Sequence, residues 1–143
     1  MMAAVTRKLE GEATIRIPFS HADPAGVVWH GRYFEYFDAA RCELLGRIDY
    51  GYKAMARSGF LWPVVDARLR FVRAVGFDDL IRVRATLVEW EYRIKIAYEV
   101  LDESGQLATE GFTIHAAVDR SSGKLCLEVP AFLRERIDRA LGG

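Results

Sequence analysis

The second half of the chain alternates between apolar and polar residues with a period of two. From 65 to 71 every second residue is apolar and the others are mostly charged, which is typical of a strand with one buried face. Turns rich in Gly, Asp and Ser separate the alternating segments, as in antiparallel hairpins. The pattern predicts long strands over 65–71, 81–87, 92–100 and 108–118, and shorter ones over 14–19 and 125–129.

Residues 31–46 have a different pattern, with apolar side chains around most of a helical circumference. Their few polar residues, among them Glu35 and Asp38, recur three to four positions apart and mark one strip. A helix that is apolar over so much of its surface is usually buried. A short helix or irregular cover is expected within 47–59, and a terminal amphipathic helix over 130–141. The sum is a single α+β domain over 1–143, with a helix packed on an antiparallel sheet.

Composition narrows the functional classes. The 143 residues carry equal numbers of basic and acidic side chains, which argues against a nucleic-acid partner because such domains usually show a basic excess. No apolar run is long enough for a membrane span, and 1–10 lacks the apolar core of a signal peptide. Cys42 and Cys126 lie in no metal-binding spacing and are expected to fill space in a reduced, cytoplasmic protein.

The segment before the long helix concentrates the candidate chemistry. Asp23 lies in a tight turn with Pro24 and Gly26, just ahead of the predicted helix start at His30 and Gly31. A carboxylate can attack a carbonyl or activate water, and free N–H groups at a helix start can hold a developing oxyanion. A turn-forming aspartate is the structural alternative, and from the local sequence alone it is the commoner one.

The residues Phe19–Tyr33, FSHADPAGVVWHGRY, resemble the signature of the 4-hydroxybenzoyl-CoA thioesterase family of the hotdog fold. The resemblance implies a curved antiparallel sheet wrapped around a long central helix, assembled as a homodimer or homotetramer. It also implies hydrolysis of an acyl- or aroyl-CoA thioester without a metal or other cofactor. By position, Asp23 matches the catalytic aspartate. The backbone N–H of His30 matches the position that helps to bind the thioester carbonyl oxygen, and the neighbouring N–H of Gly31 at the helix start is a second candidate donor.

The positions that contact substrate vary too much within the family to be carried over, so the substrate-binding candidates are proposed from the residues of this chain. Trp29 and Tyr33 are expected beside the acyl group, while Arg93, Lys95 and Arg120 are candidate partners of the CoA phosphates. A solvated sheet face is the alternative for the three basic residues.

Several alternatives stay open. Glu35 and Asp38 are rival catalytic carboxylates, whereas His21 and His115 are expected to be structural. A hotdog-fold enoyl-CoA hydratase or dehydratase, or a non-catalytic acyl-binding module, would share this architecture. The acyl group, and the choice between CoA and an acyl-carrier protein, are undetermined.

Overall fold

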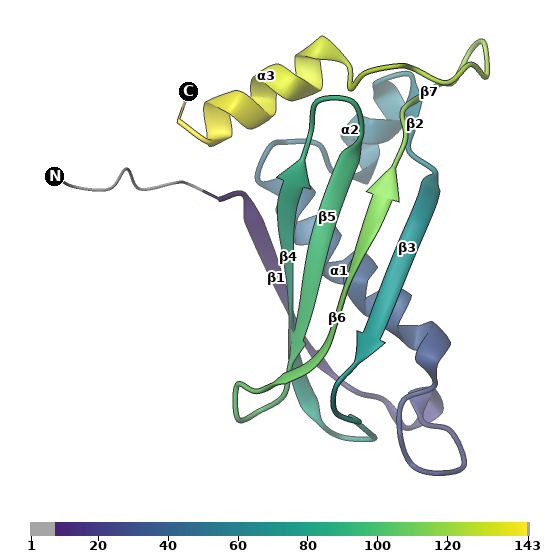
Figure 1. The fold of residues 1–143 in the computed structure, drawn as a ribbon, viewed down its shortest axis with the longest axis vertical. Helices are drawn as coiled ribbons and strands as arrows, with labels where there is room; N and C mark the ends of the chain where they lie inside the picture. The colour runs from purple at the N-terminus through teal and green to yellow at the C-terminus, as the bar shows by residue number, and fades with distance from the viewer. Residues whose placement is uncertain (1–7, 143) are drawn as a thin grey trace, which may run out of the picture.

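The computed structural model describes residues 8–142, which form a curved antiparallel sheet wrapped around one long helix (Figure 1). The order of the main sheet is β1-β4-β5-β6-β3, and every neighbouring pair is antiparallel. Its strands are β1 (Glu10–Arg16), β3 (Val64–Phe71), β4 (Leu80–Glu89), β5 (Ile94–Leu101) and β6 (Leu107–His115). A two-stranded sheet pairs β2 (Phe60–Leu61) with β7 (Val118–Asp119). The α+β architecture expected from the sequence is confirmed.

Helix α1 (Tyr33–Gly46) lies against the inner face of this sheet. Phe37 is completely buried and stacks on Tyr98 of β5, with ring centroids 4.2 Å apart. Strand β1 crosses α1 closely: a Cβ on Gly11 would lie 2.2 Å from the backbone nitrogen of Leu44. The predicted end of the helix at Gly46 is correct, and a 3-10 turn, His30–Arg32, precedes its first residue.

Two shorter helices lie near the C-terminal end of α1 (Figure 1). Helix α2 (Tyr52–Arg57) lies within the segment expected to be helical or irregular. Helix α3 (Ala131–Ala140) follows Pro130 and buries Leu133 and Ile137. None of the helices within residues 8–142 is long and apolar enough to cross a membrane.

Three strand boundaries differ from the sequence expectation. β1 begins at Glu10 and ends at Arg16, because the chain turns into a 3-10 turn, Phe19–His21, just after Pro18. The strand expected over 125–129 is wrong, since that segment makes only an isolated bridge between Leu125 and Val118. The strand expected over 108–118 is divided between β6 and β7.

Strand β3 lies at the edge of the sheet and is exposed along most of its length. Its alternation is as predicted, but the apolar face is not buried within the chain: Val65 is 59% exposed and Phe71 is 53% exposed. Only Leu69 is half-buried against the core. An exposed apolar edge strand offers unpaired backbone groups to another chain.

His115 ends β6 inside the core, as expected of a structural histidine. Its Nδ1 lies 3.2 Å from the carbonyl oxygen of Trp62, and its Nε2 lies 2.9 Å from Oγ1 of Thr113 and 3.4 Å from Nη1 of Arg41. Because a carbonyl only accepts and a guanidinium only donates, Nδ1 carries the proton and Nε2 accepts. Burial, and then the charge of Arg41, lower the pKa of His115.

This arrangement predicts a stability loss in mild acid. The unfolded chain binds a proton at His115 near the ordinary pKa of about 6.5, whereas the folded chain resists it. The contribution is therefore complete above about pH 6.5 and decreases as the pH falls below it. We expect His115→Gln to flatten the dependence of the free energy of unfolding on pH between about 5 and 7, measured by urea denaturation. His30→Gln, on the exposed loop, is the control, and an unchanged slope in His115→Gln would contradict the assignment.

Candidate functional site

The loop 22–29 is fixed by the segment 75–79 on one side and by its own turn on the other. The N–H of Val28 donates to the carbonyl of Val75 at 2.9 Å, and the N–H of Asp23 donates to the carbonyl of Val27 at 2.7 Å. Gly26 adopts a φ of 83°, a conformation that side chains rarely tolerate. A side chain at Gly76 would collide with the carbonyl of Gly26, 2.4 Å from the added Cβ. The loop is therefore held in one conformation by glycines on both sides of the contact.

Asp23 is half-buried in this loop, and its carboxylate is oriented by backbone groups. Oδ1 accepts the N–H of Ala25 at 2.9 Å and, more weakly, that of Val27 at 3.4 Å. The hydrogen bonds of the carboxylate within residues 8–142 both end on Oδ1, so Oδ2 is left for an incoming group. The turn role and the catalytic role of Asp23 are thus compatible, since each uses a different oxygen.

The start of the helix supplies hydrogen-bond donors next to Asp23. His30 and Gly31 occupy the first positions of the 3-10 turn that leads into α1, where backbone N–H groups have no partner within the helix. The imidazole of His30 is exposed and packs on Trp29, with ring centroids 5.0 Å apart. This geometry favours a role for the backbone of His30 over a role for its side chain.

The indole of Trp29 lies directly over Gly31. A Cβ on Gly31 would lie 2.2 Å from Cζ3 of the Trp29 indole. Trp29, itself 52% exposed, therefore covers the helix start as a flat apolar surface. An acyl group approaching the N–H groups of His30 and Gly31 would pass this ring.

The rival carboxylates on α1 are already engaged in ion pairs. Glu35 pairs with Arg32 at 3.0 Å and lies 4.0 Å from Nε2 of His21. Asp38 pairs with Arg41 at 2.8 Å.

The other nitrogen of His21, Nδ1, lies 2.8 Å from the hydroxyl of Tyr36, whose pKa is raised to about 12, chiefly by burial. The His21 side chain thereby links the loop to the helix, as expected of a structural residue.

Asp23 opens into a pocket of about 290 Å³. The pocket is shared by the loop, the helix start and the end of β3, and its lining includes His30, Tyr33, Phe71 and Arg73. Tyr33 packs edge-on against Phe71, with ring centroids 5.2 Å apart. The structure thus brings Asp23, His30 and Tyr33 together, three residues that the sequence analysis proposed for one site.

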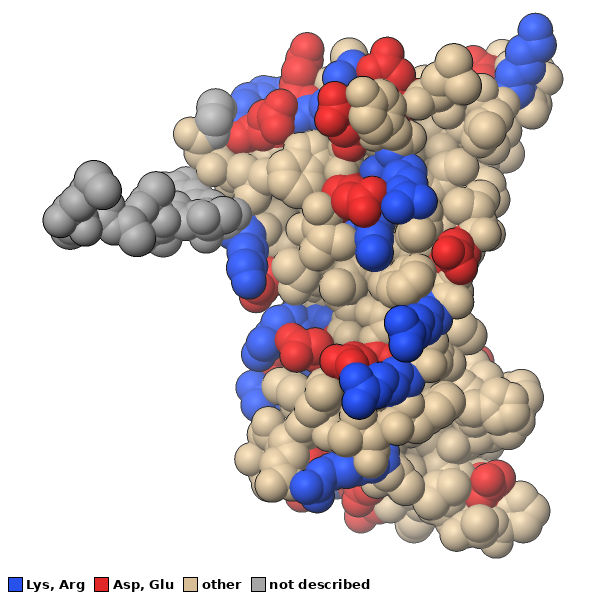
Figure 2. Space-filling view, viewed as in Figure 1, with Lys and Arg blue, Asp and Glu red and all other residues tan. Residues whose placement is uncertain are grey.

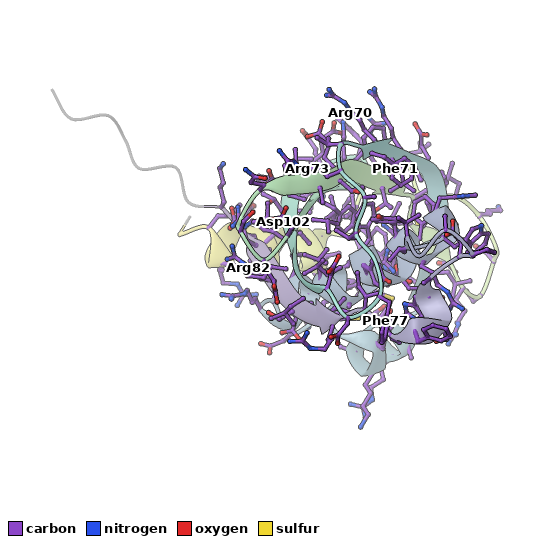
Figure 3. All side chains as sticks on the ribbon, turned by 90° about the horizontal axis from the view of Figure 1, so that it is seen from below. Arg70, Phe71, Arg73, Phe77, Arg82 and Asp102 are labelled. Atoms are coloured by element: carbon purple, nitrogen blue, oxygen red, sulfur yellow. The ribbon has the colours of Figure 1, made fainter. Side chains whose placement is uncertain are left out.

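Arg73 is a functional candidate that the sequence analysis missed. It follows β3, is exposed, and has no ion pair among the described residues. Figure 3 views the molecule from below and labels Arg73 together with Arg70, Phe71 and Asp102, whose pKa is lowered by hydrogen bonds to Ser104 and Gln106 and also by the charge of Arg73. The available signal was a run of basic residues at and after the strand, Arg68, Arg70 and Arg73, directly before the turn at 76–79.

The three basic residues proposed for CoA are not brought to Asp23 within one chain. Arg93 pairs with Glu89 at 2.9 Å between β4 and β5, and the Lys95 ammonium lies 4.6 Å from the ring centre of Phe112 on the outer sheet face. Arg120 follows β7 and approaches the carbonyl of Ala56. Figure 2 shows basic and acidic side chains interspersed over the outer face, with no uniformly basic surface. None of these three residues lines the pocket at Asp23.

The described residues were compared with the ligand sets that bind metal ions in proteins. Within residues 8–142 there is no group of three or more His, Cys, Asp or Glu side chains that could hold a metal ion.

The sequence of this chain is similar to a known protein family and to several named proteins. Residues 17–137 match the family model of the Thioesterase-like superfamily. The chain is 31% identical over 143 residues to a Synechocystis sp. protein named "Putative esterase sll0410", covering 95% of this chain and 82% of that one. It is 30% identical over 78 residues to the 4-hydroxybenzoyl-CoA thioesterase of Pseudomonas sp., covering 52% and 55% of the two chains.

Solved structures agree with the fold. A hypothetical protein from Thermus thermophilus, TT1821, superposes with a TM-score of 0.80 at 30% identity, covering 92% of this chain and 97% of that one. The DHNA-CoA thioesterase of Staphylococcus aureus superposes with a TM-score of 0.77 at 24% identity, covering 82% and 80%.

Proposed function

Because this chain belongs to the Thioesterase-like superfamily and has its hotdog fold, we propose that it hydrolyses an acyl-CoA thioester at Asp23. The observation that carries the proposal is one pocket containing both the oriented carboxylate of Asp23 and the start of α1. A thioester needs a nucleophile or base on one side of its carbonyl and hydrogen-bond donors on the other. The two requirements are met here by residues only seven positions apart.

In this mechanism the thioester carbonyl oxygen points at the backbone N–H groups of His30 and Gly31. Asp23 attacks the carbonyl carbon or deprotonates a water that does so, and negative charge builds on the oxygen. The N–H groups and the helix dipole stabilise that charge without moving. Collapse of the tetrahedral intermediate breaks the carbon–sulfur bond and releases the CoA thiolate. If water attacked, the free acid forms directly; if Asp23 attacked, a mixed anhydride with Asp23 remains, and a water molecule hydrolyses it to the free acid and the Asp23 carboxylate. The thiolate takes up a proton, and the products of both routes are the free acid and CoA.

The reaction is tested by release of free thiol from a panel of aryl-, short- and long-chain acyl-CoA esters. We expect turnover on at least one class, and the preferred class identifies the acyl group. The same acyl groups on an acyl-carrier protein test the choice of carrier. An enoyl-CoA in the panel, followed by its absorbance, tests for a hydratase. Absence of thiol release from every ester would leave an acyl-binding module.

Arg73 is placed to meet the CoA phosphates, because it is the basic side chain in the Asp23 pocket. We expect Arg73→Ala to raise KM about two- to fivefold and to leave kcat nearly unchanged, the usual size for an exposed charge contact. Added salt should raise the KM of the native enzyme and have less effect on the variant.

The double variant Arg93→Ala with Lys95→Ala is the matched comparison for Arg73. A rise in KM there would place the phosphates on the outer face of a neighbouring copy. If neither variant changes KM, the CoA is held by other residues.

We also propose that two copies of the chain associate through β3, because Val65 and Phe71 leave an exposed apolar edge on this strand. Pairing this strand antiparallel with itself would extend the sheet across two copies and bring Trp62, next to one end of β3, near the Asp23 pocket of the partner. We expect a dimer or tetramer by light scattering. Val65→Asp should shift the native protein towards the monomer, whereas Val88→Asp, on β4, should not. A monomeric native protein at micromolar concentration would contradict this assembly.

The two cysteines lie free and half-buried, and we place the enzyme in the reducing cytoplasm on this basis.

A further inference from the structure

A second pocket lies at the opposite end of α1 from Asp23. It has a volume of about 180 Å³ and is enclosed by the second half of α1, by α2 and α3, and by the inner face of β4 to β6. Its walls are mainly apolar and include Leu44, Ile48, Leu87, Ile94, Ile96, Leu133 and Ile137. Dry apolar cavities of about 150 Å³ are known to bind a benzene ring. The space therefore fits a ring or a short acyl chain.

The polar side of this pocket is rich in donors. Arg41 and Tyr52 both line it, and the Arg41 side chain is 15% exposed. The guanidinium pairs with Asp38 at 2.8 Å through Nη2, its Nη1 lies 3.4 Å from Nε2 of His115, and the hydroxyls of Tyr98 and Tyr52 also hydrogen-bond to it. Tyr52, which is 60% exposed, carries a hydroxyl that hydrogen-bonds to Arg41 and to Cys42.

The acceptors around the pocket are already occupied. The hydroxyl of Tyr50 receives the indole N–H of Trp62 at 2.7 Å and lies 2.8 Å from Oγ of Ser58. Nε2 of His115 is 2.9 Å from the hydroxyl of Thr113. A ligand that enters this pocket therefore meets donors without free acceptors, and a carboxylate satisfies such donors best.

This pocket is distinct from the one at Asp23. No residue lines both, and the eight helical steps from Tyr33 to Arg41 correspond to a rise of about 12 Å. A thioester held by Asp23 of the same chain would not place its carbonyl here.

We propose that this pocket binds a small monocarboxylic acid, with its carboxylate on Arg41 and Tyr52 and its apolar body between Ile96 and Leu133. The ligand has a single ring or about six carbons, as the volume requires. Carboxylic acids are also the class of product that thioester hydrolysis releases. The site is nevertheless defined by its own residues and does not depend on the proposed activity.

The test is calorimetric titration of the full chain with benzoate and hexanoate, each compared with its neutral amide. At pH 8 both acids are ionised and His115 is neutral. We expect one acid per chain, bound at least about tenfold more tightly than the amide, which is the usual effect of a hydrogen bond to a charged group. Asp23→Asn should bind the acid as the native protein does, because Asp23 is not part of this pocket.

Variants locate the site. Arg41→Gln should lose at least about tenfold in affinity for the acid, whereas Arg47→Gln, an exposed arginine just after α1, should lose none. Ile96→Phe should block binding by filling the space.

Four results would overturn the proposal: no binding of either acid, equal binding of acid and amide, unchanged binding in Ile96→Phe, or loss of binding in Asp23→Asn. The comparison of acid with amide uses the native protein, so it decides the question even if Arg41→Gln fails to fold.

Discussion

Asp23→Asn should lower turnover of the preferred acyl-CoA ester by at least about 100-fold while the fold and KM are largely retained. The amide keeps an oxygen that can accept the N–H groups of Ala25 and Val27, so the loop geometry survives. What is lost is the negative charge that attacks the thioester or deprotonates water. Thiol release under saturating substrate, with circular dichroism as a check on folding, measures the effect.

Three matched variants make this test specific. Glu35→Gln and Asp38→Asn remove the two carboxylates that lie on α1 in ion pairs with Arg32 and Arg41. His30→Ala keeps the backbone N–H and should cost less than Asp23→Asn. If a helix variant abolishes turnover while Asp23→Asn stays active, the catalytic carboxylate belongs to the helix. If all the carboxylate variants remain fully active, the chemistry lies outside this segment.

Phe37→Ala should be among the most destabilising single changes in the core, with a loss of about 3–5 kcal/mol in the free energy of unfolding. Phe37 is completely buried between α1 and the sheet and stacks on Tyr98 at 4.2 Å. Truncation would leave a cavity in the contact that fixes the helix to β5. Urea denaturation of the purified protein gives the value.

Phe77→Ala is the control for this loss. Phe77 is 53% exposed and contacts Phe19 edge-on at 5.4 Å, so its truncation should cost about 1 kcal/mol. Comparable losses in the two variants would mean that the stacking of α1 on the sheet contributes little to stability.

The long elements were predictable because periodicity reports burial. The alternation in β4 and β5 follows from one buried face, and the structure agrees. The apolar circumference of α1 predicted burial on most sides, but the structure buries one side of the helix and leaves Phe34 38% exposed. The start of β1 was missed because Glu10, Gly11 and Glu12 look like a polar loop. Gly11 has no side chain, so the backbone of α1 can pack directly against β1 at this position. This contact joins residues far apart in the sequence, and no local pattern reveals it. The segment 125–129 alternates as a strand should but makes only a single bridge, from Leu125 to Val118 of β7.

The candidate site was predictable to the extent that its residues are neighbours in sequence. Asp23, His30, Gly31 and Tyr33 lie in one loop and helix start, so their approach follows from the local fold. Phe71 and Arg73 come from a distant part of the chain, and the contact forms because the end of β3 meets the start of α1 at Tyr33. The pairing of Arg41 with His115 arises in the same way, across 74 residues.

The uncovered edge at β3 has a consequence for how this enzyme behaves on dilution. If catalysis requires the paired form, mass action links activity and thermal stability to the total amount of protein. The specific rate would then fall as the enzyme is diluted below the dissociation constant of the pair, and the melting temperature would fall with it. Rates compared between preparations would need to be taken at one fixed protein concentration.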